Sequence, residues 1–296
     1  MAEGAGSEKR TGKSGQQHKP VRKGNQRPKL FAPTLQTMFS LPSDLLFSRL
    51  WRRLMQPVYR SGAYNLLLGS QSYGELQTGT AESSQNLVWP GDSQAGLQIL
   101  TGEFRFAGEA IRHPSPLSNP IGASEGWRQV VNTFAWLNDL RDCGGPSAKQ
   151  LARQLMLRWI EENERYESFS WRADILAARL RNILLNHGWL EVNSDALFRS
   201  TLLHSLNRQA AHLEHALPDG LAGAALLKAV VALMLAGLML PNGEIFLAKG
   251  RQLFAVELPK QMLADGGHVE RSPQVMLELL QHLIDLRDAL VLARET

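Results

Sequence analysis

Apolar residues in the C-terminal part of the chain recur every three or four positions, in blocks separated by short breakers rich in Gly and Pro. This spacing is typical of amphipathic helices, and the breakers mark where the helices end. We predict helices at residues 124–142, 146–164, 170–189, 194–216, 220–240, 243–263 and 272–293. Consecutive helices of this length pack as antiparallel hairpins. The predicted fold class is therefore all-α, with the hairpins stacked in a solenoid or closed into a ring.

A further helix is predicted from about residue 42. Ser43 and Asp44 are residue types that cap helix N-termini, and Leu46, Leu50 and Leu54 follow at four-residue steps. Because several arginines make this helix basic, two placements stay open. It either docks on its own domain with the arginines in water, or lies on a membrane surface.

The segment of residues 61–124 breaks the helical periodicity, because it is rich in Gly, Ser, Pro and Gln. Within it, apolar residues alternate on both sides of Thr101-Gly102, at Leu97, Ile99, Phe104 and Phe106. Such alternation around a turn predicts a short β-hairpin. The remainder is predicted to be loop, and a loop of this length often shapes a binding surface.

The most apolar block, residues 221–240, has the length of a transmembrane helix. Lys228 lies near its middle, where a charge opposes membrane insertion, and ordinary amphipathic helices flank it. A helix that is apolar on nearly all sides also suits a position buried between other helices, and we predict this placement rather than a membrane span. Asp219, just before the block, is expected to cap its N-terminus.

Composition and charge change this picture mainly at the N-terminus. Hydrophobic residues form 44% of the chain and charged residues 20%, as in globular proteins. Residues 1–30 carry eight Lys or Arg and two Glu, a net charge of 8 − 2 = +6. Because the whole chain has a net charge of +4, the remaining residues are mildly acidic. We expect a disordered basic tail over residues 1–35 and one domain over residues 36–296. The tail suits weak contact with an anionic surface, and no nucleic-acid partner is expected.

Other classes of site find little support in the sequence. The single cysteine, Cys143, excludes an internal disulfide framework and any multi-cysteine metal site. His212 and His215 are spaced for one helix face but lack a matching carboxylate, so we expect no metal. No nucleotide-binding or nucleophile motif occurs, so no cofactor is expected. No apolar stretch of a secretory signal follows the basic residues, and nothing argues for export.

One motif stands out in the last breaker, where Asp265-Gly-Gly-His268 is followed by Arg271-Ser-Pro273. Further stretches precede it in a consistent order, at Thr101–Gly108, Phe134–Leu140, Trp159-Ile160, Trp171 with Arg179, and Pro218–Gly220. Together they resemble the N-terminal helical region of the heparinase II/III-like proteins, a bacterial polysaccharide lyase group. The resemblance runs from about residue 30 to the C-terminus.

The resemblance implies an incomplete (α/α) toroid followed by an antiparallel β-sandwich, with a cleft between them that binds an acidic polysaccharide such as a glycosaminoglycan. The implied chemistry is β-elimination, in which a base removes the C5 proton of a uronic acid and the bond to C4 breaks. The toroid then supplies a tyrosine as base or acid and an asparagine near the carboxylate, and the sandwich supplies a histidine. Relatives are commonly periplasmic, which conflicts with the lack of an export signal and leaves the compartment open.

Two features depart from this pattern. We expect the β-sandwich of the group to be missing from this sequence, whether through truncation of the gene, a split gene or a choice of boundary. Where lyases of the group have Tyr-His after Ser-Pro, this chain has Gln274-Val275-Met276. Valine cannot move a proton, so we expect that the usual tyrosine mechanism does not apply.

His268 is the best candidate for a catalytic side chain, because histidine titrates near neutrality and two preceding glycines let a ligand approach. The alternative is a loop histidine that only caps the last helix. Arg271 is a candidate for binding a uronate carboxylate or a sulfate, and its alternative is an ion pair with Glu270 or Asp265. Asp265 is expected to orient the loop around a bound substrate.

Asn186, His187 and Trp189 form a second candidate group at the end of the helix predicted at 170–189. The amide suits neutralisation of a carboxylate, and the indole suits stacking on a sugar. The alternative is an ordinary helix C-terminus with a histidine and a Gly stop. The other helical tryptophans are expected in the core rather than as sugar platforms, namely Trp127, Trp136, Trp159 and Trp171.

Two functions follow from these observations. The first is a heparinase II/III-like domain that binds uronate-containing polysaccharide but lacks the full catalytic machinery of a lyase. The second is a non-catalytic helical scaffold that uses the groove of the toroid for a glycan or a protein partner.

Overall fold

The computed structural model describes residues 54–69 and 89–295, all of which belong to one compact unit, Leu41–Thr296. Its elements are α3 (Gly62–Gly69), α4 (Ser93–Leu100), β1 (Glu103–Phe106), β2 (Glu109–Arg112), α5 (Glu125–Thr133), α6 (Trp136–Cys143), α7 (Gly145–Glu162), α8 (Ala173–Glu191), α9 (Ala196–Ala216), α10 (Gly223–Met239), α11 (Glu244–Gln261) and α12 (Pro273–Glu295). Residues 54–59 are also helical. The predicted tail, its boundary at residue 35 and the start of the helix near residue 42 lie outside the described residues.

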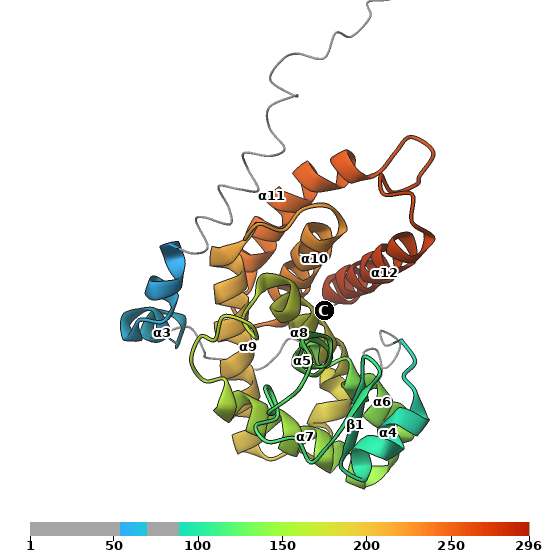
Figure 1. Ribbon diagram of the computed structural model, residues 1–296. Coiled ribbons are helices and arrows are strands. Elements are labelled where there is room, and N and C mark those ends of the chain that lie inside the picture. The colour runs from blue at the N-terminus through green and yellow to red at the C-terminus, as the bar shows by residue number, and fades with distance from the viewer. Residues whose placement is uncertain (1–53, 70–88, 296) are drawn as a thin grey trace, which may run out of the picture. The chain divides into compact units, whose positions relative to one another are not determined.

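From α7 onward the helices alternate between two layers (Figure 1). In one layer α8 packs on α10 and α10 packs on α12, while in the other α7 packs on α9 and α9 packs on α11. Successive helices also contact each other across the layers, as α8 does with α9 and α10 with α11. This arrangement of hairpins confirms the predicted all-α fold class.

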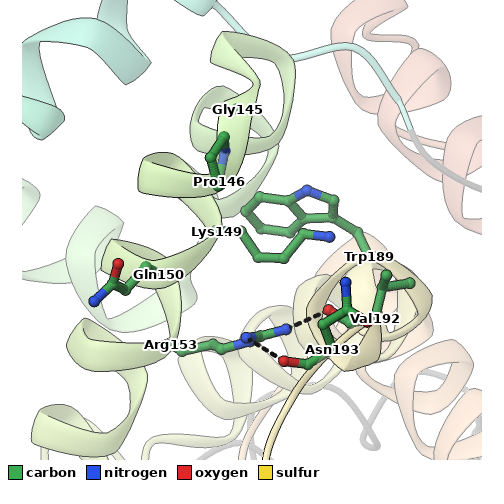
Figure 2. Close-up of a pocket in the computed structure, with 8 residues that line it drawn as sticks. All are labelled: Gly145, Pro146, Lys149, Gln150, Arg153, Trp189, Val192 and Asn193. Atoms are coloured by element: carbon green, nitrogen blue, oxygen red, sulfur yellow. Dashed lines mark hydrogen bonds between the residues drawn. The ribbon is translucent and has the colours of Figure 1, made fainter.

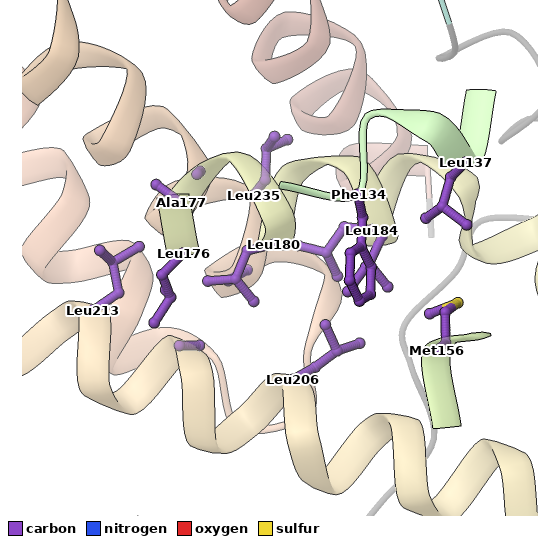
Figure 3. Packing of buried hydrophobic residues seen from close by; sticks show 14 of the residues in the cluster. Phe134, Leu137, Met156, Leu176, Ala177, Leu180, Leu184, Leu206, Leu213 and Leu235 are labelled. Atoms are coloured by element: carbon purple, nitrogen blue, oxygen red, sulfur yellow. The ribbon is translucent and has the colours of Figure 1, made fainter. Parts of the chain in front are cut away.

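Apolar side chains fill the space between the layers. Leu176, Leu180 and Leu184 follow one another along α8, and they lie toward Leu206 and Leu213 of α9 (Figure 3). Burial of an aliphatic side chain of this size contributes about 1.5–3 kcal/mol relative to exposure. The four-residue spacing thus places these three leucines on the face of α8 that packs against α9.

The predicted buried helix is confirmed as α10, whose residues are buried along most of its length. Lys228 reaches the edge of the helix, where its Nζ lies 2.8 Å from Oε2 of Glu278 on α12. No helix among the described residues is long and apolar enough to cross a membrane. Gly237 allows the close approach of α11, because a Cβ there would lie 2.5 Å from the backbone nitrogen of Leu247.

The expectation that Asp219 caps α10 is wrong. The helix begins at Gly223, and its N-cap residue is Ala222, which provides no side-chain hydrogen bond. Asp219 lies in the preceding turn with φ of 42°. It is too far along the chain to reach the first backbone N–H groups of the helix, since an N-cap side chain bonds two or three residues onward.

The β-hairpin is present, but its turn was predicted at the wrong place. Leu97 and Ile99 belong to α4, which begins because the carboxylate of Asp92 accepts hydrogen bonds from the backbone nitrogens of Gln94 and Ala95. The strands β1 and β2 follow, paired so that Phe106 lies opposite Glu109. The two-residue turn between them is Ala107-Gly108, with φ of 50° and 79°, as a tight hairpin requires.

The helix predicted at 124–142 is divided into α5 and α6. Phe134 adopts a left-handed conformation, with φ of 57°, and ends α5. Its ring lies 5.1 Å from that of Trp136 and 5.2 Å from that of Trp159, centroid to centroid. In one continuous helix, residues two positions apart do not share a face, so the break is what brings both Phe134 and Trp136 into the core.

The prediction that the helical tryptophans belong to the core is confirmed. Trp127, Trp136, Trp159 and Trp171 are all buried. Three of them also place the indole N–H on a buried acceptor, namely Phe104 O, Val131 O and Asn132 Oδ1. These side chains are therefore not sugar platforms in this structure.

Candidate functional site

The first candidate group lies at the C-terminal end of α8, where polar residues interrupt its apolar surface. Asn182 and Asn186 are one turn apart and both are buried. The Nδ2 of Asn182 donates to Thr133 O at 2.9 Å, which holds α8 to the break between α5 and α6. The spacing that puts both amides on one face of the helix therefore also aims them at the α5–α6 segment.

Asn186 forms hydrogen bonds through both ends of its amide. Its Oδ1 accepts from Nη1 of Arg141 at 3.0 Å, and its Nδ2 donates to Oδ1 of Asn138 and to Asn182 O, both at 2.8 Å. Arg141 also donates to Trp89 O at 2.9 Å. Because the amide nitrogen already has two acceptors, a sugar carboxylate would have to replace one of them to be neutralised by Asn186.

His187 forms no hydrogen bond with the residues of this network. Its side chain is buried, and Nε2 lies 2.9 Å from Oε1 of Glu191, one turn later on α8. The neighbouring imidazole of His187 lowers the pKa of Glu191. The pair lies in the last turns of α8, which continues through Gly188 to Glu191, so the Gly stop of the alternative interpretation is wrong.

Trp189 is the member of this group that lies at a pocket. The pocket, of about 500 Å³, is formed where the first turns of α7 meet the end of α8 (Figure 2). The indole of Trp189 forms one wall, and Lys149 of α7 extends beside it, with Nζ 6.0 Å from the ring centroid. Asn186 does not line this pocket, so the structure separates the predicted amide from the predicted stacking residue.

The second candidate group lies in the loop between α11 and α12, with His268 at its centre. His268 forms an antiparallel bridge with Met262, and the histidine is only 2% exposed. Its Nδ1 accepts from the backbone nitrogen of Glu270 at 3.2 Å, and Nε2 lies 3.1 Å from Oε1 of Gln261. Since Nδ1 accepts, Nε2 carries the proton and donates, so both ring nitrogens are used inside the loop.

Arg271 and Asp265 form an exposed ion pair, with Nη1 of Arg271 2.6 Å from Oδ2 of Asp265 and side chains 62% and 55% exposed. The other carboxylate oxygen accepts from the backbone nitrogen of Gly267 at 3.0 Å. The hydrogen bond from Arg271 is the main reason why the pKa of Asp265 is lowered. This pair closes the loop around His268, as the alternative interpretation of Arg271 expects.

Val275 occupies an apolar environment in the first turn of α12. It packs against a small cluster formed by Ala224, Leu227 and Leu279. At the position where the resemblance places a tyrosine, this chain therefore has a side chain that joins α12 to α10.

The two candidate groups remain apart in the bonding network. Within residues 54–69 and 89–295, no hydrogen bond or ion pair joins the α8 group to the α11–α12 loop. The same part of the chain has no cluster of three His, Cys, Asp or Glu side chains placed to hold a metal. The roles predicted for His268, Arg271, Asp265, Asn186, His187 and Trp189 in substrate binding or catalysis stay predictions.

Sequence reasoning missed the ionic contact that links α8 to α12. Nε of Arg181 donates to Oδ2 of Asp285 at 2.7 Å, and Nε1 of Trp89 donates to Oδ1 at 3.0 Å. A signal was present, because Asp285 lies between Leu279 and Leu286 on the buried face of an apolar helix, where a carboxylate needs a partner.

Comparison with known proteins gives these observations a context. The family model for the heparinase II/III N-terminus matches residues 138–293. A curated relative, FtsZ-localized protein C of Caulobacter vibrioides, is 30% identical over 208 residues, which cover 68% of this chain and 35% of that protein.

Two solved structures are similar in fold. A heparinase III superposes with a TM-score of 0.54 and 15% identity, over 82% of this chain and 43% of the other. Heparan sulfate lyase HepC from Pedobacter heparinus gives a TM-score of 0.51 and 14% identity, over 85% and 43%. The chain thus spans less than half the length of each of these relatives. The matched family model covers more than half of this chain, from α6 to α12, and the chain belongs to the heparinase II/III N-terminus family.

Proposed function

We propose that this chain is a non-catalytic helical interaction domain that has kept the heparinase-type fold. The proposal rests on the hydrogen bonding of two side chains that a lyase mechanism would need, Asn186 and His268. The amide of Asn186 and the imidazole of His268 both have their hydrogen-bonding atoms used inside the protein. A general base must instead be within hydrogen-bond reach of a substrate proton.

The side chain at position 275 supports the same conclusion. Val275 has no proton to give or take, and its packing on α10 gives it a structural role. A lyase mechanism would therefore need a proton carrier from elsewhere, in addition to a rearrangement around Asn186.

The partner we propose is a protein. The name of the curated relative places that protein with FtsZ, and the similarity to it extends over 68% of this chain. We infer that this chain shares that location, and that it reaches FtsZ by binding FtsZ or a protein assembled with it. Helical solenoids of this kind bind partners through surfaces built by successive helices.

A second candidate is binding of an acidic glycan without cleavage. It is favoured by the similarity in fold to heparinase III and to a heparan sulfate lyase. Under this alternative the fold would retain affinity for uronate chains even though Asn186 and His268 are held internally.

Co-sedimentation with FtsZ polymers separates the two candidates. The full chain is mixed with FtsZ, polymers are formed with GTP, and the pelleted fraction is measured with and without heparan sulfate or alginate. Under the proposed function the chain pellets only with polymers or with polymers plus a bridging protein, and added glycan leaves the fraction unchanged. Retention on the immobilised glycans, with none on FtsZ polymers or on their associated proteins, would overturn the proposal in favour of glycan binding.

A further inference from the structure

The pocket beside Trp189 is lined by residues to which the proposed function assigns no role. It lies between the start of α7 and the end of α8, and its volume of about 500 Å³ is within the range of about 300–1,000 Å³ typical of ligand sites (Figure 2). Its walls are formed by Gly145, Pro146, Lys149, Gln150, Arg153, Trp189, Val192 and Asn193. It is thus a pocket with two cations, an aromatic ring and no carboxylate.

Lys149 is a cation without a counter-ion. It is half-buried beside the Trp189 ring, and it forms no hydrogen bond or ion pair with any residue in the described part of the chain. Burial and the neighbouring charge of Arg153 lower the pKa of Lys149. An anion in the pocket would relieve both effects, because it would pair with the ammonium group and offset the repulsion from Arg153.

Arg153 makes the wall of the pocket rigid. Its guanidinium donates to the backbone oxygens of Leu190, Val192 and Asn193, at distances of 2.7–3.2 Å. These bonds satisfy carbonyl groups at the end of α8 but do not neutralise the charge of the arginine. The carboxylate that acts on it, Asp195, is used as the N-cap of α9.

The available acceptors argue against a sugar in this pocket. A sugar ring presents many hydroxyl donors, which need acceptors when they are buried. The backbone oxygens of Leu190, Val192 and Asn193 already accept from Arg153. Apart from the side-chain amides of Gln150 and Asn193, the lining side chains offer no acceptor, and Pro146, Trp189 and Val192 offer apolar surface.

We propose that this pocket binds an acidic peptide segment of a partner protein, with an aliphatic or aromatic side chain packed on Trp189 and a neighbouring carboxylate paired with Lys149. The inference rests on the proposed function and names the chemistry of its partner. Complementary charge and a buried apolar anchor are the two features that make a short segment bind specifically.

The test measures binding of labelled peptides to the full chain by fluorescence anisotropy at low salt. The probe is a short peptide in which Glu and Asp alternate with Leu and Phe. One comparison peptide has Lys in place of the acids, another has Ser in place of the apolar residues, and a uronate oligosaccharide serves as competitor. We expect only the acidic, apolar peptide to bind, and added salt to weaken it.

Two variants locate the binding. Lys149→Glu is expected to weaken the acidic peptide by about tenfold or more, equivalent to about 1.4 kcal/mol. Lys260→Glu changes the net charge equally, but at an exposed residue of α11 that pairs with Glu257, and it should leave binding unchanged. Trp189→Ala, with its fold checked by circular dichroism, should also weaken the peptide. Three results would overturn the proposal. They are an equal loss of peptide binding in Lys149→Glu and Lys260→Glu, no binding of the acidic, apolar peptide to the unaltered chain, and competition by the oligosaccharide.

Pelleting with FtsZ polymers distinguishes an error in the proposed pocket from an error in the proposed function. If Lys149→Glu and Trp189→Ala still pellet with FtsZ polymers as the unaltered chain does, the pocket is not the partner site and the function stands. If the unaltered chain does not pellet with FtsZ or its associated proteins, the function fails, whatever the peptides show.

Discussion

Arg181 of α8 and Asp285 of α12 form an ion pair that is almost fully withdrawn from solvent, with the carboxylate side chain 2% exposed. Burial raises the pKa of Asp285, and the charge and hydrogen bond of Arg181 oppose this. Trp89 donates to the same carboxylate, so three distant segments of the chain meet at one group. The contact joins α12 to the middle of α8.

Removing this carboxylate should be costly. Asp285→Ala leaves the Arg181 guanidinium and the Trp89 N–H without their acceptor, and we expect the free energy of unfolding to fall by about 3–5 kcal/mol. Asp288→Ala is the matched control, because Asp288 is a more exposed carboxylate on the same helix that pairs with Arg287. It should change stability by less than about 1 kcal/mol. Urea denaturation of both variants measures the difference, and similar losses would contradict a special role for Asp285.

The buried His212 should make the protein less stable in acid. Burial, followed by the nearby charges of His215 and Arg179, lowers the pKa of His212 to about 3. Below about pH 6.5 the unfolded chain takes up a proton at this residue and the folded chain does not, so acidification favours unfolding. The loss is at most about 1.4 kcal/mol for each pH unit from this one group.

Urea midpoints between pH 7 and pH 5 test this dependence. His212→Gln should reduce its slope, although the variant also loses part of the contact with the Tyr64 hydroxyl, 2.8 Å from Nδ1, and is less stable throughout. His215→Gln removes only one of the charges that lower the pKa of His212, and burial remains the main cause, so this variant should reduce the slope less than His212→Gln does. An unchanged slope in His212→Gln would mean that unfolding between pH 7 and pH 5 does not change the protonation of His212.

The contact between α10 and α11 should not tolerate a larger residue at Gly237. Gly237→Ala places a methyl group against the backbone of Leu247, and we expect a loss of about 1–3 kcal/mol. Gly62→Ala is the control, because nothing lies within 4 Å of a Cβ there. Thermal unfolding followed by circular dichroism compares the two, and a Gly237→Ala protein as stable as the control would show that the helices can separate at little cost.

His268 should behave as a structural residue. His268→Ala removes an acceptor from the Glu270 N–H and a partner from Gln261, with an expected loss of about 1–3 kcal/mol. Asp265→Ala removes the exposed pair with Arg271 and an exposed hydrogen bond from the Gly267 N–H, and it should lower the urea midpoint by less than His268→Ala does. The reverse order of stability would show that the surface pair, and not the histidine, holds this loop.

Much of the helical fold was predictable, because Gly and Pro breakers lie between blocks of regular apolar spacing. The prediction failed where a single residue leaves the helical region without a Gly or Pro, as Phe134 does with φ of 57°. The hairpin turn was misplaced because Gly102 follows the end of α4 whereas Gly108 forms the turn, and the two glycines look alike in the sequence.

The candidate site was predictable only in part. The resemblance singled out Asn186 and His268, but their hydrogen-bond partners, such as Asn138 and Gln261, follow from packing and from a loop closure that no local pattern shows. The pocket of Trp189 was missed because Lys149 comes from α7, whose contact with the end of α8 is tertiary. Residue chemistry was therefore easier to predict than which groups meet.

The most direct test of the account is the release of unsaturated uronate, followed by ultraviolet absorbance, when the full chain is incubated with a panel of acidic glycans. We expect no increase in absorbance with any glycan, because Asn186 and His268 are held by internal hydrogen bonds and position 275 is a valine. An increase that is abolished by Asn186→Ala or His268→Ala, in proteins shown to be folded, would contradict it.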